Sequence, residues 1–517
     1  MNGAESLIRT AAQAGADVIF ANPGTSELEL VAAIDRVPRM RAVLALFEGV
    51  CTGAADGYAR MSGRPGLTLL HLGCGLGNGF ANLHNARRAR APIVNLVGDH
   101  ASYHLKYDAP LTSDIACLAG VVSPWQRTSA SARTLAQDFA DALAAAQSPP
   151  GQVATLIIPS ECSWDEADGP VQVAAAPPPR PVEPTRVERT AKSLRSSNGS
   201  AILLGDRGCS ERGQRAAARV AAAVGCRLFY ETFPRRIERG AGLPAVRRLP
   251  YFPEDTLKAL EGARTLVLAG AKAPVAFFAY RGLPSLLMPE GCEALELAQP
   301  GEDIEQALED LASELDAAAG AGEMAPASRP PSPTGRLDTK GVGLALAALL
   351  PEGAIISEEA LTSGGPAYFL TQNSPPHSVI YLTGGSIGQG IPAATGAAVA
   401  CPDRRVIALQ ADGAGMYTLQ GLWTQAREGL NVTTIVFSNR AYQILRVELA
   451  RCGLTERGPR AEALTDLGHP DLDWVALARG LGVPATRPDS AEAFHADLAR
   501  ALAEPGPRLI EVVLHGP

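Results

Sequence analysis

The sequence predicts an α/β protein built from three consecutive doubly wound parallel-sheet domains. Short runs rich in β-branched residues alternate with longer Ala- and Leu-rich helical patterns along the whole chain. This alternation is typical of parallel strands that helices cover on both faces. Two proline-rich stretches, at 174–186 and 320–336, interrupt the pattern and are expected to be extended linkers. A chain of 517 residues is also too long for one hydrophobic core.

The two linkers divide the chain into three expected domains, at 1–173, 187–319 and 337–517. Each contains several strand-like runs: DVIFANPG, GLTLLHLG and APIVNLVGD in the first, SAILLGD, CRLFYET and RTLVLAG in the second, and GAIISEE, RVIALQADG and VTTIVFSN in the third. In sheets of this kind ligands bind at the carboxyl ends of the strands. The residues directly after each run are therefore the candidates for function.

Composition and charge exclude several kinds of protein. The net charge of −8 argues against nucleic acid or an anionic membrane as the main partner, because both favour a basic patch. No apolar run approaches the roughly 18 residues of a membrane span, and the N-terminus lacks the pattern of a secretory signal. The nine cysteines are scattered without a CxxC pair, which favours a reducing cytoplasm over a disulfide framework or a thiolate zinc site.

Two polar residues in the third segment follow neighbouring expected strands. Asp412 comes directly after RVIALQA, and Asn439 ends the next strand along the chain. One carboxylate and one amide oxygen at adjacent strand ends can hold Mg²⁺ and leave coordination sites free for phosphate oxygens. The small residues Gly413 and Ala414 would let backbone N–H groups approach a diphosphate. Alone, an Asp-Gly pair is also common in simple turns.

This arrangement resembles the thiamine-diphosphate enzymes, in which Gly-Asp-Gly is followed some thirty residues later by Asn-Asn. The resemblance implies that Asp412, Asn439 and the backbone carbonyl of Ala441 bind the metal, and that Tyr442 lies beside the cofactor. The sequence departs from the family pattern at two positions, where it has Ala411 and Ser438.

The first segment carries a longer match to the same family. Glu48 is followed by Ala-Asp-Gly-Tyr-Ala, as in the thiamine-diphosphate enzymes. The resemblance implies that Glu48 contacts N1′ of the aminopyrimidine and promotes deprotonation of thiazolium C2. Apolar neighbours such as Phe47 and Val50 are expected to bury the carboxyl group and raise its pKa. The alternative is a carboxylate that only caps the following helix.

Three further stretches resemble the family. Residues 21–27 resemble its early strand-to-helix turn, which implies cofactor contacts from Pro23, Gly24 and Thr25. Residues 383–392 resemble the loop beneath the cofactor, with Gly385 in it and Ile387 as the bulky residue that bends the cofactor. Residues 71–79 resemble the turn that faces the reactive carbon. Their glycines do not form GxGxxG, so we expect no dinucleotide loop there. The middle segment, 187–319, is short and has no dinucleotide loop, so we do not expect FAD in it.

The chain is most similar to acetolactate synthase large subunits and benzoylformate decarboxylases. His71 stands where the benzoylformate enzymes have a catalytic histidine, and a histidine can transfer protons near neutral pH. Those enzymes use a second histidine from the middle domain, where this chain has Phe278 and Ala279. His100 and His104 could substitute for it, or could lie in a plain surface loop.

The resemblance implies that a 2-oxo acid loses carbon dioxide to give an enamine. We expect the enamine to be ligated to a second carbonyl compound, as in acetolactate synthase. The alternative is protonation and release of an aldehyde, as in benzoylformate decarboxylase. A third possibility is an inactive, cofactor-binding regulatory or partner subunit. The family also implies a homodimer or homotetramer with active sites at the subunit interface.

Overall fold

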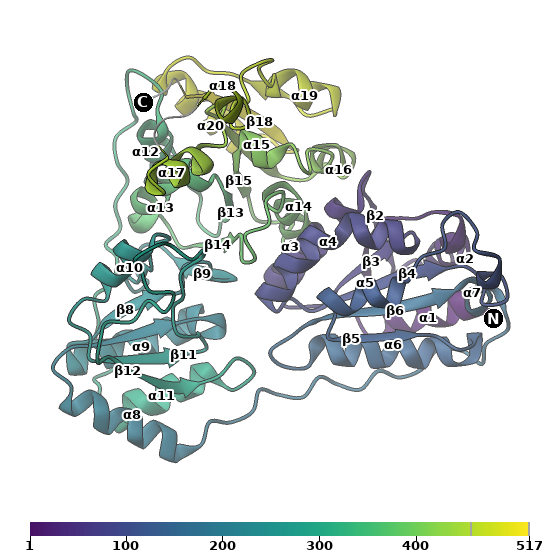
Figure 1. Ribbon diagram of the computed structural model, residues 1–517, viewed down its shortest axis with the longest axis horizontal. Helices are drawn as coiled ribbons and strands as arrows, with labels where there is room; N and C mark the ends of the chain where they lie inside the picture. The colour runs from purple at the N-terminus through teal and green to yellow at the C-terminus, as the bar shows by residue number, and fades with distance from the viewer. Residues whose placement is uncertain (455–457, 515–517) are drawn as a thin grey trace.

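The computed structural model describes residues 1–454 and 458–514 and contains three sheets (Figure 1). The first sheet is parallel throughout and has the order β2-β1-β3-β4-β6-β5. Its strands are β1 (Val18–Asn22), β2 (Arg41–Leu44), β3 (Gly66–Leu70), β4 (Ile93–Asp99), β5 (Trp125–Thr128) and β6 (Val153–Pro159). Its helices are α1 (Gly3–Gln13), α2 (Leu28–Asp35), α3 (Glu48–Ser62), α4 (Leu72–Ala89), α5 (Ile115–Val122), α6 (Ala132–Gln147) and α7 (Ser160–Trp164), and the short 3-10 turns η1 (Thr25–Glu27) and η2 (Leu105–Tyr107) lie between them.

The second sheet is also parallel and has the order β10-β8-β7-β11-β12. Its strands are β7 (Ser200–Leu204), β8 (Arg227–Tyr230), β10 (Arg247–Arg248), β11 (Thr265–Ala269) and β12 (Glu293–Ala298). The surrounding helical elements are α8 (Pro184–Ser196), η3 (Asp206–Cys209), α9 (Glu211–Val224), α10 (Pro253–Ala259) and α11 (Ile304–Glu314). The first proline-rich stretch is largely extended, as expected, but α8 begins inside it, because proline is well suited to the first position of a helix.

The third sheet has the order β17-β18-β16-β15-β13-β14-β9. Its strands are β9 (Arg236–Arg239), β13 (Ile355–Glu359), β14 (His377–Tyr381), β15 (Val406–Ala411), β16 (Val432–Ser438), β17 (Ala485–Thr486) and β18 (Arg508–Val513). Its helical elements are α12 (Thr339–Leu349), η4 (Leu361–Ser363), α13 (Gly365–Leu370), η5 (Thr371–Asn373), α14 (Gly390–Ala400), α15 (Asp412–Gly415), α16 (Gly421–Arg427), α17 (Gln443–Arg451), α18 (Pro459–Ala463), α19 (Trp474–Gly480) and α20 (Ala491–Ala503).

One strand departs from the expectation of three separate parallel sheets. β9 belongs to the middle segment by sequence, but it pairs antiparallel with β14 of the third sheet, with Arg239 opposite His377. An edge strand exposes unpaired backbone N–H and C=O groups, and β9 covers that edge of β14. The pairing ties the middle segment to the third sheet. The boundaries at 1–173, 187–319 and 337–517 otherwise stay a prediction from the linkers.

Close packing of α3 against α14 joins the first sheet to the third. Gly57 lies so close to the Ala393 backbone, and Gly396 to the backbone of Ala54, that a Cβ on either glycine would overlap its neighbour. Both helices therefore approach backbone to backbone, and their alanines share one core with both sheets. This contact fixes where Glu48, the first residue of α3, lies relative to the third sheet.

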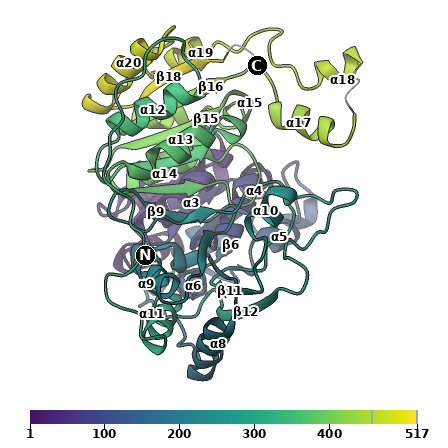
Figure 2. The same ribbon diagram turned by 90° about the vertical axis from the view of Figure 1, so that its left-hand side faces the viewer.

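No helix of the described residues is long and apolar enough to span a membrane. Figure 2 shows that α17 and α18 project from the third sheet, and α17 begins after the short turn, residues 439–442, that leaves β16. Tyr280 of the middle segment donates a hydrogen bond to Glu448 on α17, and Arg451 at the end of α17 pairs with Glu254. These contacts hold α17 beside the middle segment.

Candidate active site

A cavity of about 240 Å³ lies at the carboxyl ends of β13, β15 and β16. Parallel strands bring their carboxyl ends to one edge of a sheet, where loops can converge on a ligand. Seven residues that the sequence predicts for cofactor or metal binding line it together: Ile387, Asp412, Gly413, Ala414, Asn439, Ala441 and Tyr442. Six further lining residues were not predicted from the sequence, namely Leu361, Thr362, Tyr417, Gln443, Ile444 and Leu445. Position after strand β13 could have identified Leu361 and Thr362.

Asp412 lies almost completely buried at this edge, with 1% of its surface exposed. Its Oδ1 accepts the backbone N–H of Gly413 over 2.8 Å, and its Oδ2 accepts that of Arg440 over 2.7 Å. Burial raises the pKa of Asp412 to about 6, and the two backbone hydrogen bonds oppose that rise. Each carboxylate oxygen keeps a second lone pair for a ligand, and a bound cation would favour the ionised form.

Asn439 and Ala441 share the turn that leaves β16. Asn439 Oδ1 accepts the backbone N–H of Ala441 over 3.0 Å, and Arg440 between them has a left-handed backbone with φ of 58°. Across residues 1–454 and 458–514, no group of three or more His, Cys, Asp or Glu side chains could hold a metal ion. A cation in this cavity would therefore need a mixed set of one carboxylate, one amide and backbone oxygens, which suits the hard cation Mg²⁺.

The two departures from the family pattern leave this turn intact. Ala411 has φ of −77° and ψ of 144°, a backbone conformation open to any residue, so glycine is not required there. Ser438 is buried at the end of β16, where it pairs with Val513 of β18. Gly413, in contrast, lies close to Tyr442, and a Cβ there would lie 2.6 Å from Cε1 of that ring.

A buried carboxylate shapes the loop that carries Ile387. Glu359, at the end of β13, accepts the backbone N–H groups of Gly388, Gln389 and Gly390 over 2.7, 3.2 and 2.7 Å. Burial raises the pKa of Glu359, and these hydrogen bonds oppose the rise. Three N–H groups directed at one carboxylate fix the loop backbone beside the cavity.

Gly385 lies in the same loop but outside the lining of the cavity. Its backbone is left-handed, with φ of 76°, and a Cβ there would overlap the ring of Phe277 from the middle segment. The sequence predicts a cofactor contact for Gly385. The structure places it under Phe277, which packs an aromatic ring from the middle segment onto the third-sheet loop.

Glu48 lies in the first domain, at the start of α3, and is 7% exposed. Asn78 Nδ2 on α4 donates a hydrogen bond to Glu48 Oε2 over 3.0 Å. A Cβ on Gly75 would lie 3.1 Å from Oε1, so the first turns of α4 pack closely over the carboxyl group. The expectation of a buried Glu48 is met. The role of Asn78 as its hydrogen-bond donor was not predicted.

His71 immediately precedes α4 and lies against the turn that follows β1. Its Nδ1 is 2.8 Å from Oε2 of Glu27 and 3.3 Å from Oγ of Ser26. The backbone N–H of Gly24 donates to the same Glu27 oxygen over 2.7 Å. The predicted residues Pro23, Gly24 and Thr25 thus lie in the turn that surrounds His71. The pairing of His71 with Glu27 was not predicted, because the two residues are far apart in sequence.

Helices α3 and α4 hold the loop that carries Ile387. Asn82 Nδ2 donates to the carbonyl of Gly388 over 3.1 Å, and Asn85 Nδ2 donates to that of Ser386 over 2.7 Å. Gln389 Nε2 donates to Asp56 over 2.9 Å. The Ala-Asp-Gly-Tyr-Ala stretch therefore connects the helix of Glu48 to the loop beside the third-sheet cavity.

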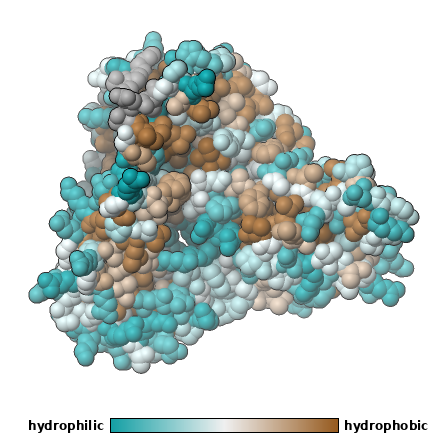
Figure 3. Space-filling model, in the orientation of Figure 1, coloured by the Kyte–Doolittle hydropathy of each residue, from teal (hydrophilic) through white to brown (hydrophobic). Residues whose placement is uncertain are grey.

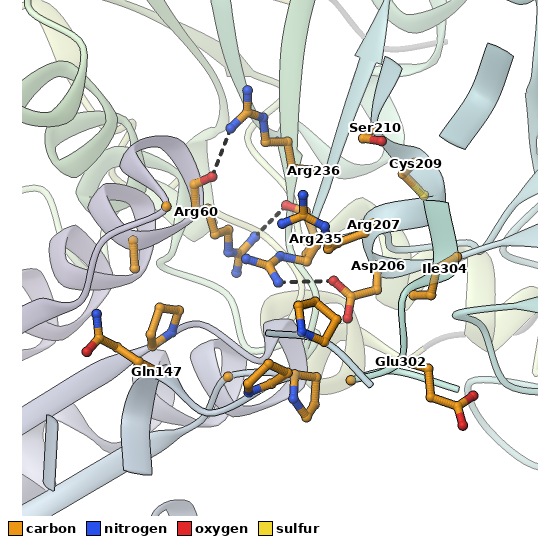
Figure 4. Close-up of a pocket in the computed structure, with 18 of the residues that line it drawn as sticks. Arg60, Gln147, Asp206, Arg207, Cys209, Ser210, Arg235, Arg236, Glu302 and Ile304 are labelled. Atoms are coloured by element: carbon orange, nitrogen blue, oxygen red, sulfur yellow. Dashed lines mark hydrogen bonds and ion pairs between the residues drawn. The ribbon is translucent and has the colours of Figure 1, made fainter. Parts of the chain in front are cut away.

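A second, larger cavity of about 690 Å³ is lined by residues whose contacts anchor α3 to the middle segment (Figure 4). Arg60 of α3 forms a fully buried ion pair with Asp56 and donates to the carbonyl of Arg235. Arg236 donates to the carbonyl of Arg60, and Arg235 pairs with Asp206. These contacts bind α3 to the middle segment. None of the residues predicted for the cofactor lines this cavity.

Comparison with known proteins agrees with this arrangement. Residues 1–117 match the N-terminal TPP binding domain of thiamine pyrophosphate enzymes, and residues 363–512 match the C-terminal TPP binding domain. A Mycobacterium tuberculosis protein, IlvX, provisionally named an acetolactate synthase large subunit, is 52% identical over 99% of both chains. The chain belongs to the thiamine pyrophosphate enzymes. Benzoylformate decarboxylase of Pseudomonas aeruginosa is 29% identical over 96% of each chain.

Solved structures show the same fold at lower sequence identity. A 4-hydroxybenzoylformate decarboxylase of Rhodococcus jostii has a TM-score of 0.86 at 24% identity, with 100% of both chains covered. Benzoylformate decarboxylase of Polynucleobacter necessarius has a TM-score of 0.85 at 22% identity, covering 99% of this chain and 98% of that one. The three α/β domains expected from the sequence are those of thiamine pyrophosphate enzymes.

The residues present fit the cofactor of this family, thiamine diphosphate with Mg²⁺. A buried carboxylate with raised pKa, an amide oxygen and a narrow cavity stand at the site where the metal and diphosphate are expected. Gly413 and Ala414 keep the floor of that cavity free of bulky side chains. The residues predicted to bind the metal are therefore gathered in the third domain of this thiamine pyrophosphate enzyme.

Two other expectations concern a second proton-transfer residue in the thiamine pyrophosphate enzyme. His100 and His104 follow β4 and pack on each other, with ring centroids 5.5 Å apart, and His104 also packs on Tyr107. Phe278, in the place expected for a second histidine, is 56% exposed and contacts the ring of Phe277. The middle segment thus presents aromatic rings, not a histidine, beside the loop at Gly385.

Proposed function

We propose that this thiamine pyrophosphate enzyme decarboxylates a 2-oxo acid and ligates the remaining fragment to a second carbonyl compound. The observation that carries the proposal is the cavity that gathers Asp412, Asn439, Ala441 and Ile387 at one sheet edge. The relative that is 52% identical over the whole length, and whose name refers to acetolactate synthase, supports ligation as the second half of the reaction.

The roles of the residues follow from their positions. Asp412, Asn439 and the Ala441 carbonyl would hold Mg²⁺ and, through it, the diphosphate. Ile387 would support the middle of the cofactor, and Glu48 would hold a proton at N1′ of its aminopyrimidine. Thiamine diphosphate, when bound, supplies the nucleophilic carbon and the electron sink for loss of carbon dioxide. Burial of Glu48 beside Asn78 supports its role, because a proton held away from water can be delivered to a single site.

A second candidate is release of an aldehyde after decarboxylation, as the name of the 29% identical relative suggests. The contact of His71 with Glu27 favours this outcome, because an imidazole oriented by a carboxylate is an effective proton-transfer group. The apolar Phe278 in place of a second histidine favours ligation instead, because one proton-transfer group fewer is available.

We further propose a homodimer or homotetramer in which each cofactor lies between the first domain of one chain and the third domain of another. No residue of the first domain is among those that line the third-domain cavity. Tyr417 and Leu445, which line it, are 52% and 48% exposed in the single chain. Figure 3 shows apolar residues gathered over the third domain and along the first. Exposed apolar patches of this kind favour subunit contacts.

The nine cysteines are all free thiols, which supports the expectation of a reducing, cytoplasmic compartment.

Product analysis tests the proposed reaction. Purified enzyme with thiamine diphosphate and Mg²⁺ is incubated with pyruvate, with benzoylformate and with both, and the products are separated by chromatography. Acetohydroxy-acid or mixed ligation products are expected, whereas aldehyde alone would favour the second candidate. Cofactor binding without turnover of any 2-oxo acid would indicate the inactive regulatory or partner subunit.

A further inference from the structure

We propose that Glu27 is a positioning residue that fixes which nitrogen of His71 carries the proton. The inference rests on the second candidate reaction, release of an aldehyde, in which His71 transfers protons. Glu27 is completely buried, and its Oε2 lies 2.8 Å from Nδ1 of His71, whose side chain is 24% exposed. Its other oxygen, Oε1, is buried and has no hydrogen-bond partner among the described residues. A buried carboxylate with an unpaired oxygen is costly, so stability alone does not explain this residue.

Two glycines leave room for the Glu27 and His71 side chains. A Cβ on Gly98 of β4 would overlap the Glu27 carboxylate, and a Cβ on Gly24 would overlap the His71 ring. The N–H of Gly24 donates to Oε2 of Glu27, which is also the oxygen that faces His71. Two close glycine approaches and a shared acceptor oxygen hold the carboxylate in one orientation.

Within residues 1–454 and 458–514, the two hydrogen-bond contacts of the His71 ring are both made by Nδ1. Besides Glu27, Ser26 Oγ lies 3.3 Å from this nitrogen. A carboxylate can only accept, so it selects the tautomer with hydrogen on Nδ1 and leaves a lone pair on Nε2. A buried carboxylate plays the same part for the histidine of serine proteases, where loss of the correct tautomer lowers kcat by roughly 10⁴-fold.

The tautomer of His71 determines whether its Nε2 can take part in proton transfer. Release of an aldehyde requires a proton for the carbon that lost carbon dioxide and removal of the proton from its hydroxyl group, so that the carbonyl forms as the bond to the cofactor breaks. The protonated ring delivers its Nε2 proton to the carbon, and Nε2, with its lone pair then free, accepts the hydroxyl proton, which restores the protonated ring for the next turnover. Glu27, bound to Nδ1, keeps Nε2 available for both transfers.

The test is the tautomer of His71 in the holoenzyme, read from ¹⁵N-histidine NMR at a pH where the ring is neutral. The His71 signals are assigned from their loss in His71→Gln. Hydrogen on Nδ1 is expected in the wild type and in Glu27→Gln, whose amide oxygen can still accept from Gly24 and His71. Hydrogen on Nε2 is expected in Glu27→Leu. The matched control is Glu29→Leu, two residues further on and hydrogen-bonded to Asn2, which should leave the tautomer unchanged.

Gly98→Ala provides a second route if Glu27→Leu does not fold, because the added Cβ displaces the carboxylate without removing it. It should give the same change of tautomer, and in either variant kcat for aldehyde formation should fall by about 10²–10⁴-fold with KM nearly constant. An unchanged tautomer in Glu27→Leu and Gly98→Ala would overturn the inference. The NMR readout needs no turnover, so a failure of the proposed reaction would be seen separately, in the product analysis.

Discussion

The backbone N–H of Arg440 donates a hydrogen bond to Oδ2 of Asp412 over 2.7 Å and thereby joins the ends of β15 and β16. The left-handed backbone at Arg440 turns the chain there, and Asn439 and Ala441 on either side of it line the cavity that Asp412 also lines. The position of the carboxylate is therefore set by a neighbouring strand, not by its own loop alone.

Asp412→Ala should abolish metal-dependent cofactor binding, because it removes the only charged ligand in the expected set. Even outer-shell partners of a metal site are commonly worth about 10–100-fold in affinity, and a direct ligand should exceed that. Isothermal titration calorimetry of the cofactor-free protein with thiamine diphosphate, with and without Mg²⁺, measures the effect. The matched control is Asp403→Ala at an exposed site. Unchanged affinity in Asp412→Ala would refute the assignment.

Mg²⁺ affinity should fall as the pH drops below about 6, the value to which burial raises the pKa of Asp412. The metal binds the ionised carboxylate, so affinity should decrease by about tenfold per pH unit below that value. In the cofactor-free protein the sign is opposite. The folded carboxyl group holds its proton to a higher pH than the unfolded one, so its contribution to the free energy of unfolding falls as pH rises from 3.8 to about 6. Asp412→Asn should remove both dependences.

Glu48→Gln should preserve the fold and cofactor binding but slow activation of thiazolium C2. The amide keeps the size of the buried group but lacks the acidic proton, and such acid–base contributions are commonly about 10²–10⁴-fold in rate. Hydrogen–deuterium exchange at C2 of bound cofactor measures this step. Exposed Glu352→Gln serves as the control. Near-normal exchange in Glu48→Gln would show that another group activates the cofactor.

Two inactive variants should restore activity when they are combined in one dimer. If each cofactor lies between two chains, a heterodimer of Glu48→Gln and Asp412→Ala has one intact site and one doubly altered site. Heterodimers purified by two different affinity tags should then show about half of wild-type activity. Sites formed within single chains would give no recovery. Homodimers of each variant, purified in the same way, provide the baseline.

Gly413→Ala should weaken thiamine diphosphate binding, because the new Cβ would lie 2.6 Å from Tyr442 Cε1 and displace the ring at the edge of the cavity. Gly480→Ala is the matched control, since no heavy atom lies within 4 Å of a Cβ there. Calorimetric affinities and thermal unfolding of both variants separate a local effect from general destabilisation. Equal affinity in the two variants would mean that the Tyr442 ring can move without affecting the site.

The fold class and most of the residues gathered at the third-domain cavity could be predicted from the sequence alone. Parallel strands place function at their carboxyl ends, and so Asp412 and Asn439 could be expected to meet from their positions after two neighbouring strands. Glu48 could be identified because its surrounding motif is continuous in the chain. Such local patterns can be recognised without knowing which distant segments they contact.

Features that depend on contacts between distant segments became visible only in the folded chain. The antiparallel pairing of β9 with β14 crosses the expected domain boundary, and no local pattern encodes a strand's partner. The hydrogen bond from Asn78 to Glu48 and the pairing of His71 with Glu27 arise where separate turns and helices meet. Phe277 reaches Gly385 only because the middle segment packs on the third sheet. Side-chain periodicity predicts which face of an element is buried, whereas the partner on that face is set by how whole domains pack together.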